Sequence, residues 1–442
     1  MTPEKSLFSD RNFAFLFGAD TASKLGTQVT ILALPLIAAV TLRATPLQIG
    51  LLTAAQMLAF LLIGLPAGAW VDRVRRRHVL IVSDLGRFAL LASIPVAWWL
   101  DVLGLPQLYV VALLNGAFTV FFDVAHQSYL PHLVGRDRLV EANSRVATVD
   151  SAAMTSGPAL AGFLIQILTA PVAIVVDAVS YLFSAACLAV IRRPERRPER
   201  APDRHLGREV AEGLRYVFGH RLLRPIAMAT ATFNLFASMR NAMLIVVVAS
   251  VLHLPASNIG LLMAFLGAGG LVGSLVARRV GARLGPGPAM WIPMVAATPF
   301  VFLVPLVHTG WRLWLAGLAL GVSGIAIACY NITQLSLRQR VTPERLLGRM
   351  NATMRFLVWG TLPLGAAAGG LIGQYATPRA ALWTAAAGLA LSWLPVFVSP
   401  LRTLRQPPPA QPLPNPPAPA QPPSHQPATA SPPVETPASQ AR

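Results

Sequence analysis

Twelve apolar runs, separated by polar turns or by turns containing Gly or Pro, follow one another along the chain. A bilayer core of ~30 Å needs about 20 apolar residues in an α-helix, and each run is long enough to supply them. The sequence therefore predicts an all-α polytopic membrane protein. The predicted spans are 13–40, 47–71, 78–100, 107–129, 145–168, 171–191, 225–250, 258–277, 288–308, 312–334, 351–373 and 380–400.

The composition agrees with a membrane protein. Hydrophobic residues make up 54% of the 442 positions and charged residues only 12%, whereas ~25% of the residues in a typical soluble domain are charged. The net charge of +18 would ordinarily suggest a nucleic-acid partner. That interpretation needs the cations gathered on one face of a soluble domain, and the sequence has no such domain, so we predict no nucleic-acid binding.

The cations fall on one side of the predicted membrane. If the N-terminus is cytoplasmic, the inward segments hold 29 of the 36 Lys and Arg residues, and the outward loops hold only Arg43, Arg312 and Arg379. Cytoplasmic loops carry such an excess of cations, and one span more or fewer in the middle would scramble it. We therefore predict a multi-pass protein of the cell (inner or plasma) membrane with both termini in the cytoplasm and a retained first span.

The polar stretch 192–224 divides the twelve spans into six and six. Short internal repeats support this division, because the turn at Gly68 returns at Gly273, 205 positions later, and the turn at Val134 returns at Val341, 207 positions later. The predicted domains are an N-terminal six-helix bundle (1–191), a cytoplasmic linker (192–224), a C-terminal six-helix bundle (225–400) and a disordered Pro-rich cytoplasmic tail (401–442).

Two motifs resemble signatures of the major facilitator superfamily. Gly68, Asp72, Arg73, Arg76 and Arg77, in the turn after span two, are similar to its cytoplasmic gating loop, and Gly157, Pro158 and Gly162 in span five are similar to its antiporter motif. Segments 122–131 and 142–144 resemble the drug/proton antiporter branch that contains macrolide efflux proteins and siderophore (enterobactin) exporters. The resemblance covers about residues 10–400 and implies two six-helix bundles around a central cavity.

The sequence departs from these signatures in three places. Arg75 stands where the loop signature usually has Gly, and Ala161 replaces one of the paired glycines of the antiporter motif. The span-four Arg of many drug/proton antiporters has no counterpart near Asn115. The third departure leaves the route of the proton open.

Both motifs also have a physical interpretation. Asp72, at the cytoplasmic end of span two, would pair with arginines of its own turn or with a helix N-terminus of the other half, and so act as a latch between two states. The alternative is that the arginines only follow the charge rule of membrane topology. Gly157, Pro158 and Gly162 would allow span five to kink and to pack closely on a neighbour, which is also what ordinary small-residue packing would do.

Charged residues inside the spans mark the candidate transport site, because they are costly in a membrane. All five such acids, Asp20, Asp84, Asp123, Asp150 and Asp177, lie in the first half. Asp20 and Asp123 are on spans one and four, which line the cavity in transporters of this fold, and either is predicted to carry the coupling proton. His126 shares the helix face of Asp123 and would relay the proton.

Each of these assignments has a plainer alternative. Asp20 would pair with Lys24 four residues along the helix, and Asp84 would pair with Arg87. His126 would be an interfacial histidine near the end of its span.

The second half contributes Arg240 and Asn234, near the middle of span seven. After Glu212 the only acids are Glu344 and Glu435, so Arg240 must face water, backbone carbonyls, an anionic group of the substrate, or Asp20 or Asp123 across the cavity. We predict that Arg240 and Asn234 line the cavity and that Arg240 is the charge partner of the acids.

We therefore predict a secondary active transporter that exports amphipathic small molecules by proton antiport with alternating access. The expected partners are a small-molecule substrate, protons and the lipid bilayer, and the transporter is expected to be a monomer. No nucleotide loop or ligand cluster is present in the sequence, so we expect no enzyme activity, no cofactor and no metal. The alternatives are a facilitator or importer of a metabolite on the same fold, or a membrane scaffold that acts through the Pro-rich tail.

Overall fold

The computed structural model describes residues 7, 10–71, 73–135, 138–191 and 206–406. Within them, twelve helices are long and apolar enough to cross a membrane, which confirms the predicted number of spans. The first six are α1 (Arg11–Leu36, continued by the π-helical turn η2, Ile37–Thr41), α2 (Pro46–Val71), α3 (Arg76–Trp99), α4 (Leu105–Val134), α5 (Leu139–Leu168) and α6 (Ala170–Val190).

The second six follow a shorter helix, α7 (Leu206–Gly219), that lies in the predicted linker. They are α8 (Leu223–Val246, continued by the π-helical turn η3, Val247–Val251), α9 (Ala256–Leu284), α10 (Pro288–Val301, followed by η4, Val304–Leu306), α11 (Trp311–Val341), α12 (Glu344–Tyr375) and α13 (Pro378–Leu391, followed by α14, Leu394–Phe397, and η5, Pro400–Thr403). The Pro-rich tail from residue 407 onwards lies outside the described residues.

Several helices extend beyond the apolar runs that predicted them. α9 continues to Leu284, past the predicted end at 277, and α12 begins at Glu344, before the predicted start at 351. The added turns carry arginines, which favour a helix but interrupt an apolar run. Hydropathy therefore locates the part of each helix that lies in lipid rather than the ends of the helix.

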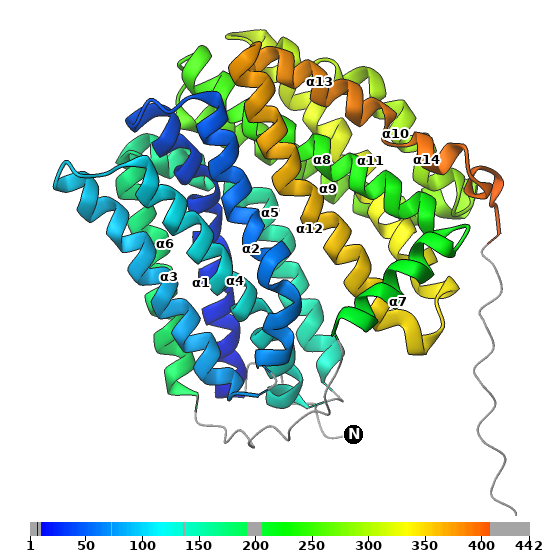
Figure 1. Ribbon diagram of the computed structural model, residues 1–442, viewed down its shortest axis with the longest axis horizontal. Helices are drawn as coiled ribbons and strands as arrows, with labels where there is room; N and C mark the ends of the chain where they lie inside the picture. Colours follow the sequence, from blue (N-terminus) through cyan, green and yellow to red (C-terminus); the bar gives the residue numbers. More distant parts are fainter. Residues whose placement is uncertain (1–6, 8–9, 72, 136–137, 192–205, 407–442) are drawn as a thin grey trace, which may run out of the picture.

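The helices form two bundles, α1–α6 and α8–α13, that lie side by side in Figure 1. In the first bundle α1 packs on α5 and α6, and α3 packs on α4 and α6; in the second, α11 packs on α9 and α10, and α8 packs on α12 and α13. The bundles meet along two helix pairs, α2 with α12 and α5 with α9. The arrangement confirms the predicted fold class.

The two halves repeat one another in local detail. Each first helix ends in a five-residue π-helical turn, and the N–H of Leu42 donates to Ile37 O as the N–H of Leu252 donates to Val247 O, both at 2.9 Å. The next residues, Arg43 and His253, have nearly equal positive φ values of 50° and 51°. This internal repeat agrees with the division of the chain into two related halves.

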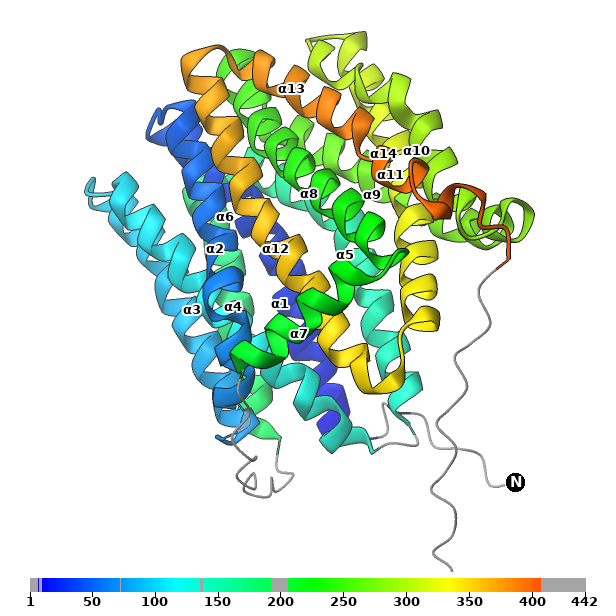
Figure 2. The same ribbon diagram turned by 45° about the vertical axis from the view of Figure 1, so that its right-hand side comes forward.

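The helices have two distinguishable ends. The basic end is where α2 joins α3 and α4 joins α5, and it carries most of the arginines; the π-helical end carries η2 and η3. In Figures 1 and 2, α2 and α12 lie close together near the π-helical end and diverge toward the basic end. The backbones of α2 and α12 are therefore in contact near the π-helical end and farther apart near the basic end.

Glycines allow the close contact near the π-helical end. A Cβ atom built on Gly50 of α2 would lie 2.6 Å from Ala366 O and 2.8 Å from the Cα of Gly370, both on α12. On α5, a Cβ atom at Gly162 would lie 3.0 Å from the Cα of Gly260 on α9. Any larger side chain at these four glycines would force the helices apart, so small residues decide how closely the two halves approach.

The helix α7 is fixed to the second half rather than standing free as a linker. Glu212 forms an ion pair of 2.7 Å with Arg349 of α12, and the hydroxyl of Tyr216 donates to Val341 O at 3.3 Å. Val217 is fully buried in the apolar cluster at this end of the second bundle. The part of the predicted linker that the structure describes is therefore a helix that packs on α12.

Substituting Gly260→Val should open the π-helical end. The new side chain meets the backbone of Pro158 and Gly162, and overpacking of this kind typically costs about 1–3 kcal/mol. We expect spin labels at the exposed positions Thr41 and Val251 to move apart in the variant, as measured by pulsed electron resonance after replacement of the two native cysteines.

The control is Gly270→Val on the same helix, where an added Cβ meets no atom within 4 Å among the described residues. Equal distance distributions in Gly260→Val and the control would show that the glycine contact does not hold this end closed.

Candidate functional site

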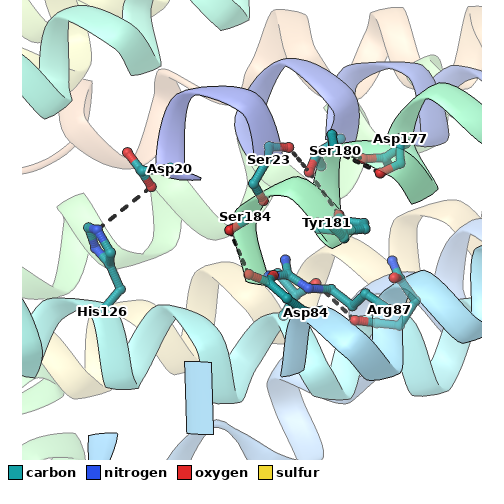
Figure 3. A network of polar contacts seen from close by, with 12 residues as sticks. Asp20, Ser23, Asp84, Arg87, His126, Asp177, Ser180, Tyr181 and Ser184 are labelled. Atoms are coloured by element: carbon teal, nitrogen blue, oxygen red, sulfur yellow. Dashed lines mark hydrogen bonds and ion pairs between the residues drawn. The ribbon is translucent and has the colours of Figure 1, made fainter. Parts of the chain in front are cut away.

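Asp20 lies in a cluster of charged residues formed by α1, α4 and α5. Its side chain is buried and forms an ion pair of 2.8 Å with Lys24, and Lys24 also contacts Asp150 of α5 at 2.6 Å. His126 of α4 points toward Asp20, with 3.8 Å between Nε2 and Oδ1 (Figure 3). The ion pair of Asp20 with Lys24, expected from their spacing on the helix, is therefore present. Lys24 also pairs with Asp150, a contact that the sequence did not predict.

Asp123 lines a cavity between the two halves. The cavity has a volume of about 260 Å³, and its walls come from α2 and α4 of the first half and α12 of the second. Asp123 faces it from α4 and Arg355 from α12, so a carboxylate and a guanidinium from opposite halves share one space. The rings of Phe60 and Trp359 stack with centroids 4.0 Å apart and join α2 to α12 at the wall.

The remaining intramembrane acids of the first half lie in a separate polar network (Figure 3). Asp84 forms an ion pair with Arg87 and accepts a hydrogen bond of 2.6 Å from Ser184 Oγ. Asp177 accepts hydrogen bonds from Thr30 Oγ1 and Ser180 Oγ. Asp84, Arg87 and Asp177 are almost completely buried.

Arg87 of this network lies between aromatic rings of two neighbouring helices. The guanidinium carbon of Arg87 lies 4.1 Å from the ring centre of Tyr181 and 4.4 Å from that of Phe122. These rings and the hydroxyls tie α1, α3, α4 and α6 together inside the bundle. The ion pair of Asp84 with Arg87, predicted as the plainer alternative, is thus present, and the network holds the first bundle together.

Arg240 lies inside the second bundle. Its side chain is 3% exposed, and its Nη2 and Nε donate to Oδ1 of the adjacent Asn241 at 3.0 and 3.2 Å. Asn234 donates to Thr230 O of its own helix at 2.8 Å. The predicted pairing of Arg240 with Asp20 or Asp123 is not among the contacts of the described residues, because the Arg240 face of α8 packs against α10, α11 and α13.

The antiporter motif packs span five on two neighbours. A Cβ at Gly157 would collide with the side chain of Gln28 on α1, and the carbonyl of Pro158 and the Cα of Gly162 lie against Gly260 of α9. The motif therefore contributes both to the first bundle and to the contact between the halves.

The gating-loop residues are only partly described. Arg77 donates to the carbonyls of Leu188 and Ala189 at 2.9 and 2.5 Å and so caps the C-terminus of α6. Arg76 begins α3, and Arg73 is exposed in the turn before it. Gly68 belongs to α2, whereas Asp72 lies outside the described residues, so the predicted latch has no structural description.

Arg355 is the residue that the sequence reasoning missed. Arg355 lies inside predicted span eleven (351–373), as Arg240 lies inside span seven, so the same signal marks both. The sequence could not show which of the two faces the first half, because that depends on the rotation of each helix about its own axis.

Residues 16–362 match the family model of the Major Facilitator Superfamily. The chain belongs to this superfamily. The resemblance predicted from the loop and span-five motifs is thus confirmed, and the protein is a transporter of a family and fold whose members are generally not enzymes.

Relatives of this transporter include exporters. It is 27% identical over 379 residues to the enterobactin exporter EntS of Citrobacter koseri, covering 82% of this chain and 86% of the relative. It is 28% identical over 373 residues to the multidrug efflux pump Tap of Mycobacterium tuberculosis, covering 81% and 86%.

Solved structures of the same fold include bacterial homologues of an iron transporter. A bacterial homologue of the iron transporter ferroportin in its inward-facing state gives a TM-score of 0.72 at 18% identity, covering 89% of this chain and 99% of the other. A homologue in its outward-facing state gives 0.57 at 19% identity, covering 87% and 98%. Both comparisons show that this chain has the fold of these structures.

Asp84→Asn should destabilise the first bundle without touching the cavity. The substitution leaves Arg87 buried without a charged partner, and breaking a buried pair typically costs about 3–5 kcal/mol. We expect a lower melting temperature of the purified transporter in detergent, followed by tryptophan fluorescence.

The matched control is Asp101→Asn, at an exposed turn with positive φ that Asn also tolerates. A melting temperature of Asp84→Asn equal to that of the control would contradict a structural role for the network.

Proposed function

We propose that this transporter exports amphipathic small molecules by proton antiport with alternating access. The observation that carries the proposal is the cavity between the halves, where Asp123 and Arg355 lie among aromatic walls. Such a space suits a molecule with an apolar body and a few polar groups. The relatives EntS and Tap, described as an exporter and an efflux pump, support the outward direction.

We propose that the basic end faces the cytoplasm. The excess of arginines at this end follows the charge rule of membrane topology, and the N-terminus and the C-terminal tail would then both be cytoplasmic. The halves are separated at this end and closed by glycine contacts at the other. In this orientation the conformation would receive substrate from the cytoplasm, as an exporter requires.

Asp123 is the proposed meeting point of proton and substrate. It shares its cavity with Arg355 of the other half, so the charge of one carboxylate influences how the halves attract each other. Protonation would weaken that attraction, while a substrate cation would compete with the proton for the same carboxylate. Competition of this kind makes binding of substrate and proton mutually exclusive, which is the condition for exchange.

Asp20 is the second proposed proton carrier. Its contact with His126 gives a released proton a neighbouring acceptor, and the ion pairs of Lys24 with Asp20 and with the half-exposed Asp150 extend the cluster of charges to α5. His126 lies on α4 three residues after Asp123. It would relay the proton from Asp20 toward the cavity that Asp123 lines. The latch formed by Asp72 and its arginines remains part of the proposal.

A facilitator or importer on the same fold is the second candidate. Structures of the same fold include a homologue of an iron transporter, and the fold itself sets no direction. A scaffold that acts through the Pro-rich tail would instead lose function when residues 406–442 are deleted, and transport assays would show no activity. Because both halves of the transport path lie in one chain, a monomer is sufficient for the proposed cycle.

Asp123→Asn and Asp20→Asn should each abolish transport driven by a pH gradient while leaving the fold intact. Neutral side chains of the same size cannot bind and release the proton that drives exchange. The measurement is substrate-induced proton movement in reconstituted vesicles, screened with hydrophobic cations, macrolides and siderophores, with and without an imposed gradient.

Asp101→Asn serves as the control, since this exposed acid lies at the opposite, π-helical end. Wild-type transport that ignores the gradient would favour a facilitator. Full gradient-driven activity in both acid variants would refute the carboxylate assignment.

A further inference from the structure

A small space inside the second bundle lies next to Arg240. It has a volume of about 20 Å³, and helices α8, α10, α11 and α13 all contribute to its wall. The polar residues of the wall are Arg240, Ser323 and Ser392, and the remainder of the wall is apolar. The space is separate from the cavity of Asp123, with which it has no lining residue in common.

The guanidinium of Arg240 brings a full charge into this space. Among the described residues, its hydrogen-bond acceptor is the neutral amide oxygen of Asn241. The apolar cluster around it includes Ala237, Val301 and Leu389. A buried charge is costly unless it is paired, and an arginine keeps its charge in proteins, so an anionic partner is needed.

The described part of the chain places no carboxylate beside Arg240. Beyond Glu212 the sequence contains only Glu344 and Glu435 as acids. Glu344 is the first residue of α12, at the basic end, whereas Arg240 lies only two turns from the π-helical turn that follows α8. The acids of the first half, Asp20 and Asp123, have other partners or another cavity.

We propose that Arg240 binds a single monatomic anion, chloride, in this space. A volume of about 20 Å³ accommodates one particle of water size, which needs at least ~10–15 Å³, and is too small for a carboxylate-bearing organic substrate. The hydroxyls of Ser323 and Ser392 donate to carbonyls of their own helices at 2.8 and 2.6 Å. Either hydroxyl can rotate to donate a hydrogen bond to an anion, whereas the apolar side chains of the wall have no hydrogen-bond donor.

The anion would act on the stability of the second bundle. It neutralises a buried cation at the junction of four helices. A ligand that binds only the folded state stabilises that state in proportion to the logarithm of its concentration above the dissociation constant. The site takes no part in the proposed movement of protons, so it can be tested without a transport assay.

The test compares the melting temperature of the purified full-length transporter in sodium chloride, sodium bromide and sodium gluconate at equal ionic strength. We expect chloride and bromide to raise the melting temperature with increasing concentration and gluconate to leave it unchanged. In Arg240→Gln the dependence on halide should disappear, because the charge that holds the anion is gone.

Arg338→Gln is the matched control, since Arg338 is also a buried arginine of the second bundle but lies on α11 near Asn351. It should keep the halide dependence. Equal melting temperatures of the wild type in all three salts, or an unchanged halide response in Arg240→Gln, would overturn the proposal.

Crystals of the wild type grown in bromide give a second readout that does not require the variant to fold. An anomalous bromide peak beside the Arg240 guanidinium supports the site. Water alone at that position, in a crystal with bromide bound elsewhere, refutes it.

Discussion

The close backbone contact between the two halves near the π-helical end is the feature on which the rest of the structure depends. It exists because Gly50, Gly162, Gly260 and Gly370 leave no side chain between helices α2 and α12 or α5 and α9. With this end closed, the halves diverge toward the basic end, and the cavity of Asp123 lies between them. In a membrane, where lipid gives no hydrophobic drive for helices to associate, close packing of small residues supplies much of the attraction.

The intramembrane acids and the arginines Arg240 and Arg355 lie in different halves, so a relative movement of the halves changes the distances between some of these charges. Every intramembrane acid belongs to the first half, while Arg355 and Arg240 belong to the second. Asp84 and Arg87 satisfy each other inside the first bundle and so stay together when the bundle moves. Asp123 and Arg355 belong to different bundles, so their separation changes with conformation, and a change in either charge alters the balance between states.

Much of the fold and part of the site follow from particular residues of the sequence. The twelve apolar runs and the one-sided arginines predicted the spans, and the spacing of Asp20 with Lys24 and of Asp84 with Arg87 predicted pairs that the structure contains. Both pairs are local, so helix geometry alone brings them together. The pairing of Lys24 with Asp150 could not be predicted, because it joins helices far apart in the sequence.

The sequence by itself determined the number of spans, their division into two halves, the concentration of acids in the first half and the absence of an acidic partner for Arg240 in its own half. Only the tertiary structure decided that Arg355 reaches the cavity between the halves and that Arg240 turns into the second bundle. The physical reason is that a charge inside a span shows only that its face avoids lipid, and does not show whether that face meets the cavity or the neighbouring helices of its own bundle. Packing against neighbouring helices sets the rotation of each span, and with it the surroundings of each charge.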